Sequence, residues 1–201
     1  MNVKLQYSTA FNAGSWFEQE LYMSTYQVRL KLVTQTLDPT DQNIALERIK
    51  YFLLAELHST IFVGHAEHDR AEEFASLGLD VTTLPEEPVD QVVGIMLYYK
   101  LNAIMEGRMR LAELVISSDA GDSIEYFHSE DEHTDIFPSA GWWHEATPVH
   151  SDIAFEEDDK VVVLDPTAVW RELDLAWNAN EVATELGQVV FANFNQNETK
   201  H

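Results

Sequence analysis

Two stretches near the N-terminus alternate between apolar and polar side chains, which is the period of a half-buried β-strand. The first covers residues 3–11, and the tetrapeptide at 12–15 is expected to end it. The second covers residues 26–34, with Gln27, Arg29 and Lys31 on its polar face. That face is either solvated or turned toward an anion or the inside of an oligomer. The pattern of residues 16–23 is ambiguous.

Two later stretches carry apolar residues three or four positions apart, which is typical of helices with one buried face. The first helix presents Ala45, Ile49, Phe52, Leu53 and Leu57. The second presents Val89, Val93, Leu97, Leu101 and Ile104. Pro88 and Asp90 suit the start of this second helix, and Gly107 suits its end. We therefore expect two helices that pack beside one another.

Residues 109–128 read as a β-hairpin, because two β-rich runs flank the turn-rich sequence Asp119-Ala120-Gly121-Asp122. The predicted order is β-β-α-α-β-β, with residues 65–84 as a long loop between the helices. This order predicts an α+β domain over residues 1–128, in which two helices cover one face of a four-stranded antiparallel sheet.

The composition changes near residue 129, where the chain becomes acidic and aromatic without a regular period. We expect residues 129–201 to form an irregular α/β extension docked on the first domain, with a strand at 161–164 and a helix at 165–177. Trp142 and Trp143 follow Gly141 within this extension. Their rings either dock the extension onto the sheet or form a stacking platform or subunit contact.

The element order resembles the tunnelling fold, the superfamily of 6-pyruvoyl-tetrahydropterin synthase and GTP cyclohydrolase I. The resemblance covers about two thirds of the chain, through the segments YSTAF, YQVRLKL, ALERIKYFLLAEL and AELVISSDAGDSIEYF. It implies homo-oligomers whose sheets join into a barrel. It also implies ligand sites at subunit interfaces, where an acidic side chain holds a pterin or purine ring.

This sequence differs from the synthase-like members at two functional positions. Their three zinc-binding histidines lie on the first two strands, whereas residues 10–12 and 23–26 contain no histidine here. Their ring-binding glutamate corresponds to the region of Ser118 and Asp119, and Glu113 lies several residues earlier. The candidate ligand-binding residues are therefore Glu113, Ser118, Asp119, Trp142 and Trp143, and the family's zinc chemistry is expected to be absent.

Histidines occur in pairs that offer a second kind of site. His65 and His68 are spaced for one face of a helical turn, and His128 and His133 flank an acidic run. A third pair is formed by His144 and His150. Imidazole and carboxylate groups together suit a divalent metal such as zinc, manganese or iron. The spacing matches no specific metal motif, so solvated loops are the alternative, and no cofactor is assigned.

The net charge narrows the range of partners. The chain has 35 acidic and 12 basic residues and a formal charge of −23, which disfavours nucleic acids and anionic membranes. It contains no cysteine, which excludes a disulfide framework and a thiolate nucleophile. The first residues lack the apolar run of a signal peptide, so a cytoplasmic location is expected.

Three functions remain open at this stage. The first is a divergent tunnelling-fold protein that binds a pterin- or purine-like heterocycle at a subunit interface. The second is a non-catalytic structural or interaction protein, viral or accessory, built on the same sheet. The third is a metal-dependent hydrolase that uses the loop histidines. Whether the protein is an enzyme is left undecided by the sequence.

Overall fold

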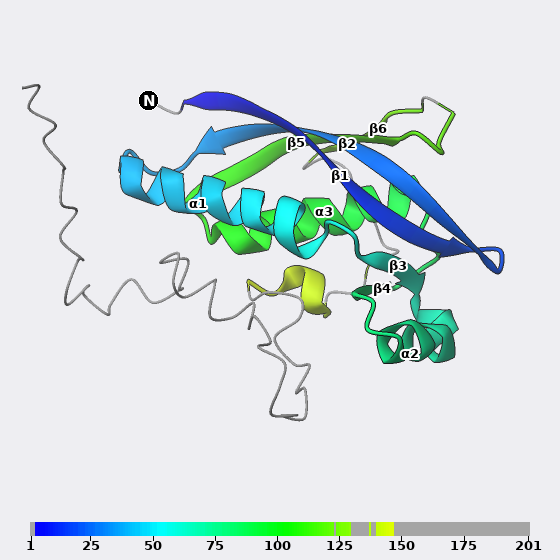
Figure 1. Cartoon of the computed structure of the whole chain (residues 1–201). Helices are drawn as coiled ribbons and strands as arrows, with labels where there is room; N and C mark the ends of the chain where they lie inside the picture. The colour runs from blue at the N-terminus through cyan, green and yellow to red at the C-terminus, as the bar shows by residue number, and fades with distance from the viewer. Residues whose placement is uncertain (1–2, 123, 130–136, 138–139, 147–201) are drawn as a thin grey trace, which may run out of the picture.

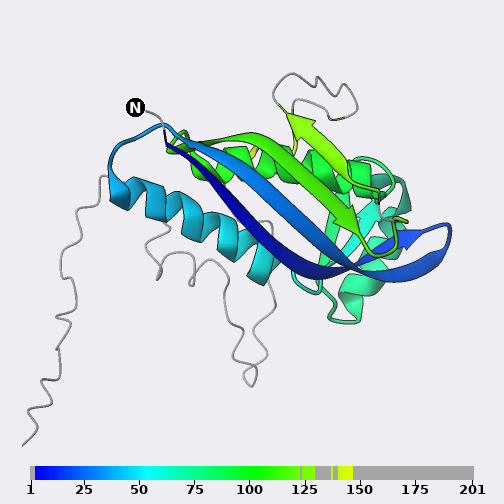
Figure 2. The ribbon, with the colours of Figure 1, turned by 90° about the horizontal axis from the view of Figure 1, so that it is seen from above.

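A computed structural model describes residues 3–122, 124–129, 137 and 140–146. Their strands form one mixed sheet, twisted and covered by helices mainly on one face (Figures 1 and 2). The sheet has six strands in the order β4-β3-β1-β2-β5-β6. The bounds are β1 Lys4–Phe17, β2 Glu20–Thr34, β3 Ile61–Gly64, β4 Val81–Leu84, β5 Met109–Ser118 and β6 Tyr126–Ser129.

Two of the main helices cover the inner face of this sheet. The helices are α1 Pro39–Tyr51, α2 His68–Ser76 and α3 Asp90–Met105, with a π-helical turn η1 at Phe52–Glu56 and 3₁₀ turns η2 at His65–Glu67 and η3 at Trp142–His144. The predicted stripe from Ala45 to Leu57 is buried, which confirms the first helix. α3 confirms the second, and the β5–β6 pair confirms the hairpin.

The prediction of a four-stranded antiparallel sheet was wrong at one edge. β3 pairs in parallel with β1, and β4 pairs in parallel with β3. The helix α2 connects β3 to β4, so the expected loop at 65–84 is a β-α-β crossover. Each of these strands has four residues, which is too short for a visible alternation, and all four residues of β3 are buried.

The expected break at residues 12–15 is also wrong, because β1 continues to Phe17. The ambiguous residues 16–23 form the end of the β1–β2 hairpin. Glu18 and Gln19 make its turn with positive φ angles of 50° and 64°. Such turns usually contain Asn or Gly, so this pair gave no recognisable turn signal.

α3 is buried on nearly all sides. It lies between the sheet, α1 and the aromatic residues of the C-terminal segment, and Phe137 and Trp143 belong to the same core. Trp142 donates a hydrogen bond from Nε1 to the carbonyl of Thr83 on β4, at 2.9 Å. The two tryptophans therefore dock the C-terminal segment onto the rest of the domain, which is the first of the two alternatives given for them. The strand and helix expected at 161–164 and 165–177 lie outside the described residues.

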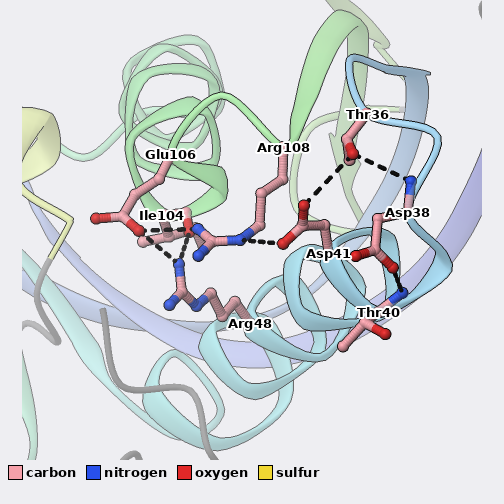
Figure 3. Close-up of polar contacts among 8 residues, drawn as sticks. All are labelled: Thr36, Asp38, Thr40, Asp41, Arg48, Ile104, Glu106 and Arg108. Atoms are coloured by element: carbon pink, nitrogen blue, oxygen red, sulfur yellow. Dashed lines mark hydrogen bonds and ion pairs between the residues drawn. The ribbon is translucent and has the colours of Figure 1, made fainter. Parts of the chain in front are cut away.

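An ion network fixes α1 against the end of α3 (Figure 3). The buried Arg48 donates from Nη1 to the Ile104 carbonyl and to Glu106 Oε2, both at 3.1 Å. Glu106 also accepts from Arg108, whose Nε lies 3.4 Å from Asp41 Oδ1. Burial lowers the pKa of Arg48 to about 10, so the guanidinium stays charged at neutral pH.

Close packing of α3 on the sheet depends on Gly94. A Cβ atom there would lie 2.2 Å from His128 Nε2 and 2.8 Å from Ile116 Cγ2. We expect Gly94→Ala to lower the free energy of unfolding by about 1–3 kcal/mol, although Gly→Ala within a helix normally stabilises. Chemical denaturation measures the change. The exposed Gln91→Ala on the same helix is the control, and a Gly94→Ala protein as stable as wild type would contradict the packing.

Candidate functional site

Asp119 is fixed at the end of the β2–β5 pair. Its Oδ1 accepts a hydrogen bond from the backbone N–H of Thr25 at 2.8 Å, and its own N–H donates to the Thr25 carbonyl at 3.3 Å. These two bonds hold both the backbone and the carboxylate in place. Among the described residues, no group donates to the second carboxylate oxygen, Oδ2, which is therefore available to a ligand.

Other polar groups belong to the residues next to Asp119 and Thr25. Thr25 Oγ1 donates to Asn12 Oδ1 at 3.0 Å, and the N–H of Ser118 donates to Asp90 Oδ2 at 3.1 Å. The hydroxyl of Ser118 is buried and has no hydrogen-bond partner in the described part of the chain. A buried hydroxyl normally finds a partner, so a water or a ligand group that reached this one would satisfy it.

Tyr26 lies beneath this group in the core, where its hydroxyl is 2.8 Å from Ser15 Oγ. Burial raises the pKa of Tyr26 to about 12, and the negative charges of Asp90 and Asp119 add to the effect. Tyr26 is therefore neutral at physiological pH. The sheet end has a negative field, which suits a neutral ligand rich in N–H donors rather than an anion.

Of the predicted ligand-binding residues, the structure brings only Ser118 and Asp119 together. Glu113 lies on the opposite, outer face of β5 and pairs with Lys31 at 2.6 Å. Trp142 and Trp143 pack on the helical side, against α3. Ser118 and Asp119 stay candidates for ligand binding, whereas the other three residues belong to separate parts of the fold.

The histidines are spread over both edges of the sheet. His65 and His68 are exposed beside β3, and His68 pairs with Glu72 at 3.1 Å. His128 is buried on β6, at the other edge. No group of three metal-binding side chains occurs within the described residues. His133 and His150 lie outside them, and His144 lies against the Tyr99 ring at 4.6 Å.

Sequence reasoning missed a buried cation on α3. Lys100 is fully buried and donates from Nζ to the carbonyls of Trp142 and Glu145, at 3.1 and 2.9 Å. Burial lowers the pKa of Lys100 to about 8, against the opposing effect of the Glu56 and Glu145 carboxylates. The spacing alone could have predicted the burial of Lys100, because it lies four residues after Met96 and therefore on the same apolar face of the helix.

The turn η1 brings Glu56 into the same buried region. It is a π-helical turn, an irregularity often found at functional positions, and Glu56 is 5% exposed. Lys100 thereby links η1, α3 and the segment 140–146. The contacts of the amine with two carbonyls make this centre an anchor for the C-terminal segment.

No protein-family model and no curated protein matches the chain. Solved structures similar to it include 6-pyruvoyltetrahydropterin synthase from Plasmodium vivax, at 12% identity and a TM-score of 0.42, covering 64% of this chain and 97% of that one. The Plasmodium falciparum enzyme is similar at 14% identity and a TM-score of 0.42, covering 63% and 96%. An uncharacterized protein from Wolinella succinogenes matches at 10% identity and a TM-score of 0.49, covering 65% and 99%.

Solved tunnelling-fold synthases are thus among the structures similar to this chain, as the element order led us to expect. At these identities and TM-scores the similarity assigns no family, ligand or reaction to the chain. No helix among the described residues is long and apolar enough to cross a membrane.

The depressed pKa of Lys100 predicts how stability changes with pH. Between about pH 8 and 10.5 the unfolded chain keeps a proton on this amine that the folded chain has lost, so stability rises with pH. We expect wild type to gain up to about 3 kcal/mol relative to Lys100→Met over this range. Denaturation of both proteins at pH 7 and 10 measures the difference, and a constant difference would contradict it.

Proposed function

We propose that the protein binds a planar pterin- or purine-like heterocycle at the sheet end around Asp119, in an assembly of identical copies. The observation that carries this proposal is the fixed Asp119 carboxylate with Oδ2 available, and the preceding residue, Ser118, adds a hydroxyl without a partner among the described residues. The proposal agrees with what the element order implies, an acidic side chain that holds the ring.

The chemistry of such rings fits this group of acceptors. A pterin or a guanine presents an exocyclic amine next to a ring N–H, and a carboxylate accepts both in a bidentate, charge-assisted pair. Asp119 needs no rearrangement to do so, because Thr25 already orients it. The hydroxyl of Ser118 can accept or donate a further hydrogen bond.

Two strand edges support an assembly of copies. β3 pairs with β1 only at Gly14, Ser15 and Trp16, so the earlier part of β1 has a strand partner on one side alone among the described residues. β6 is the last strand at the other end of the sheet. Unpaired edges are templates for another strand, and pairing β6 of one copy with β1 of the next generates a ring when the rotation between copies closes.

The hairpin that carries Asp119 also carries exposed apolar side chains. Ile124 and Phe127 are 52% and 56% exposed. A neighbouring copy at the β6 edge would cover them and would lie next to the Asp119 group. This arrangement favours a ligand site completed by the neighbouring copy.

The native mass tests the assembly. The monomer has a mass of 23.0 kDa. We expect light scattering to give a multiple of this value that persists on dilution, because edge pairing buries backbone groups and apolar surface. A monomer across the concentration range would contradict the assembly.

Asp119→Asn tests the ligand. We expect the substitution to weaken binding of neopterin or guanosine about 10- to 100-fold, because a charge-assisted pair is replaced by an amide that cannot accept both hydrogens. Calorimetry measures the affinity, and Asp122→Asn in the same turn is the matched control. If wild type binds neither compound, ligand binding is disproved, and a stable multimer would then favour the structural alternative.

A further inference from the structure

The outer face of the sheet gathers basic side chains in an otherwise acidic chain. The register of the strands places four of them on this face: Lys4, Arg29, Lys31 and Arg110. The whole chain has only 12 Lys and Arg residues against 35 acidic ones. The acidic side chains Glu113 and Glu125 pair with Lys31 and Arg29 on the same face.

A hollow of about 380 Å³ lies at the centre of this face. Its volume falls in the range of small-molecule sites, about 300–1,000 Å³. Ser8, Ala10, Gln27, Arg29, Ser117 and Glu125 are among the residues that line it. Apart from Glu125, the polar side chains of this lining can all donate hydrogen bonds. The hollow is therefore a donor-rich site with a guanidinium.

Glu125 already acts as an anion at this site. Its Oε1 accepts a hydrogen bond from Arg29 Nη2 at 2.7 Å, with both side chains about half exposed, at 45% and 48%. Ion pairs with this exposure contribute little to stability, so another anion can replace the carboxylate at little cost. Glu125 lies just before β6, in the connection from β5.

We propose that this hollow binds a small phosphate-type anion, which takes the place of Glu125 on Arg29. A guanidinium binds phosphate through two parallel N–H···O bonds, and the hydroxyls and amide of the lining add further donors. The site lies on the face of the sheet opposite α1 and α3, and its lining includes neither Ser118 nor Asp119. The net charge of −23 repels anions at a distance, so the affinity comes from these local donors.

Calorimetric titration of the full chain with sodium pyrophosphate, at constant ionic strength near 0.15 M, tests the proposal. Wild type is expected to bind saturably, and Arg29→Met to bind at least tenfold more weakly. Lys50→Met is the matched control, because Lys50 forms a similar exposed pair with Glu47 on α1, at 2.6 Å, and its loss changes the net charge equally. Its affinity should equal that of wild type.

Glu125→Gln separates a ligand site from a structural ion pair. Removing the competing carboxylate should tighten pyrophosphate binding several-fold, whereas a merely structural pair predicts unchanged or weaker binding. The proposal is overturned if wild type gives no saturable heat, if Arg29→Met and Lys50→Met weaken binding equally, or if Glu125→Gln does not tighten it. Asp119→Asn should bind pyrophosphate with wild-type affinity. The same variant should bind the heterocycle more weakly, so failure of one site can be distinguished from failure of the other.

Discussion

The rest of the structure depends on burying α3 on nearly all of its sides. Ten of its sixteen residues are buried, so no single neighbour can cover it. The sheet covers one side, with Gly94 allowing His128 to approach, and α1 covers another. The segment containing Trp143 covers a third side. Because Lys100 interrupts this apolar surface, the carbonyls of the same segment must satisfy it. Covering α3 and satisfying its lysine therefore require the same residues.

The parts of the fold that the sequence predicts correctly are those with a long period and one buried face. β2 alternates over the seven residues from Tyr26 to Leu32, and the stripe from Ala45 to Leu57 extends over more than three helical turns. β3 and β4 could not be recognised, because four residues do not establish a period and β3 is buried throughout. The turn at Glu18 and Gln19 lacked a glycine, so the full length of β1 was missed. In each case long-range pairing overrides the local signal.

The candidate site was only partly predictable for a related reason. Ser118 and Asp119 are candidates because the resemblance implies that the ring-binding glutamate lies at this point of the hairpin. Their chemistry comes from Thr25, 94 residues away from Asp119 in the chain, and no spacing pattern links the two. The strand places Glu113 on the outer face, where it pairs with Lys31. His65 and His68 are paired by their helical spacing and His128 with His133 by the acidic run between them, but three strands separate β3, which precedes His65, from β6, which carries His128.

The distribution of charge links the two proposed sites to the proposed assembly. Copies of a chain with a charge of −23 repel one another, and contacts between acidic surfaces would be unfavourable at low salt. The outer sheet face is the exception, because it carries the four basic side chains named above against the two acidic ones that pair with Arg29 and Lys31. A ring closed through β1 and β6 would bring copies of this face nearer to one another, whereas α1 and α3 on the other face carry no net charge. An anion bound at Arg29 would reduce the repulsion between the basic groups gathered there, so ligand binding and assembly would favour each other.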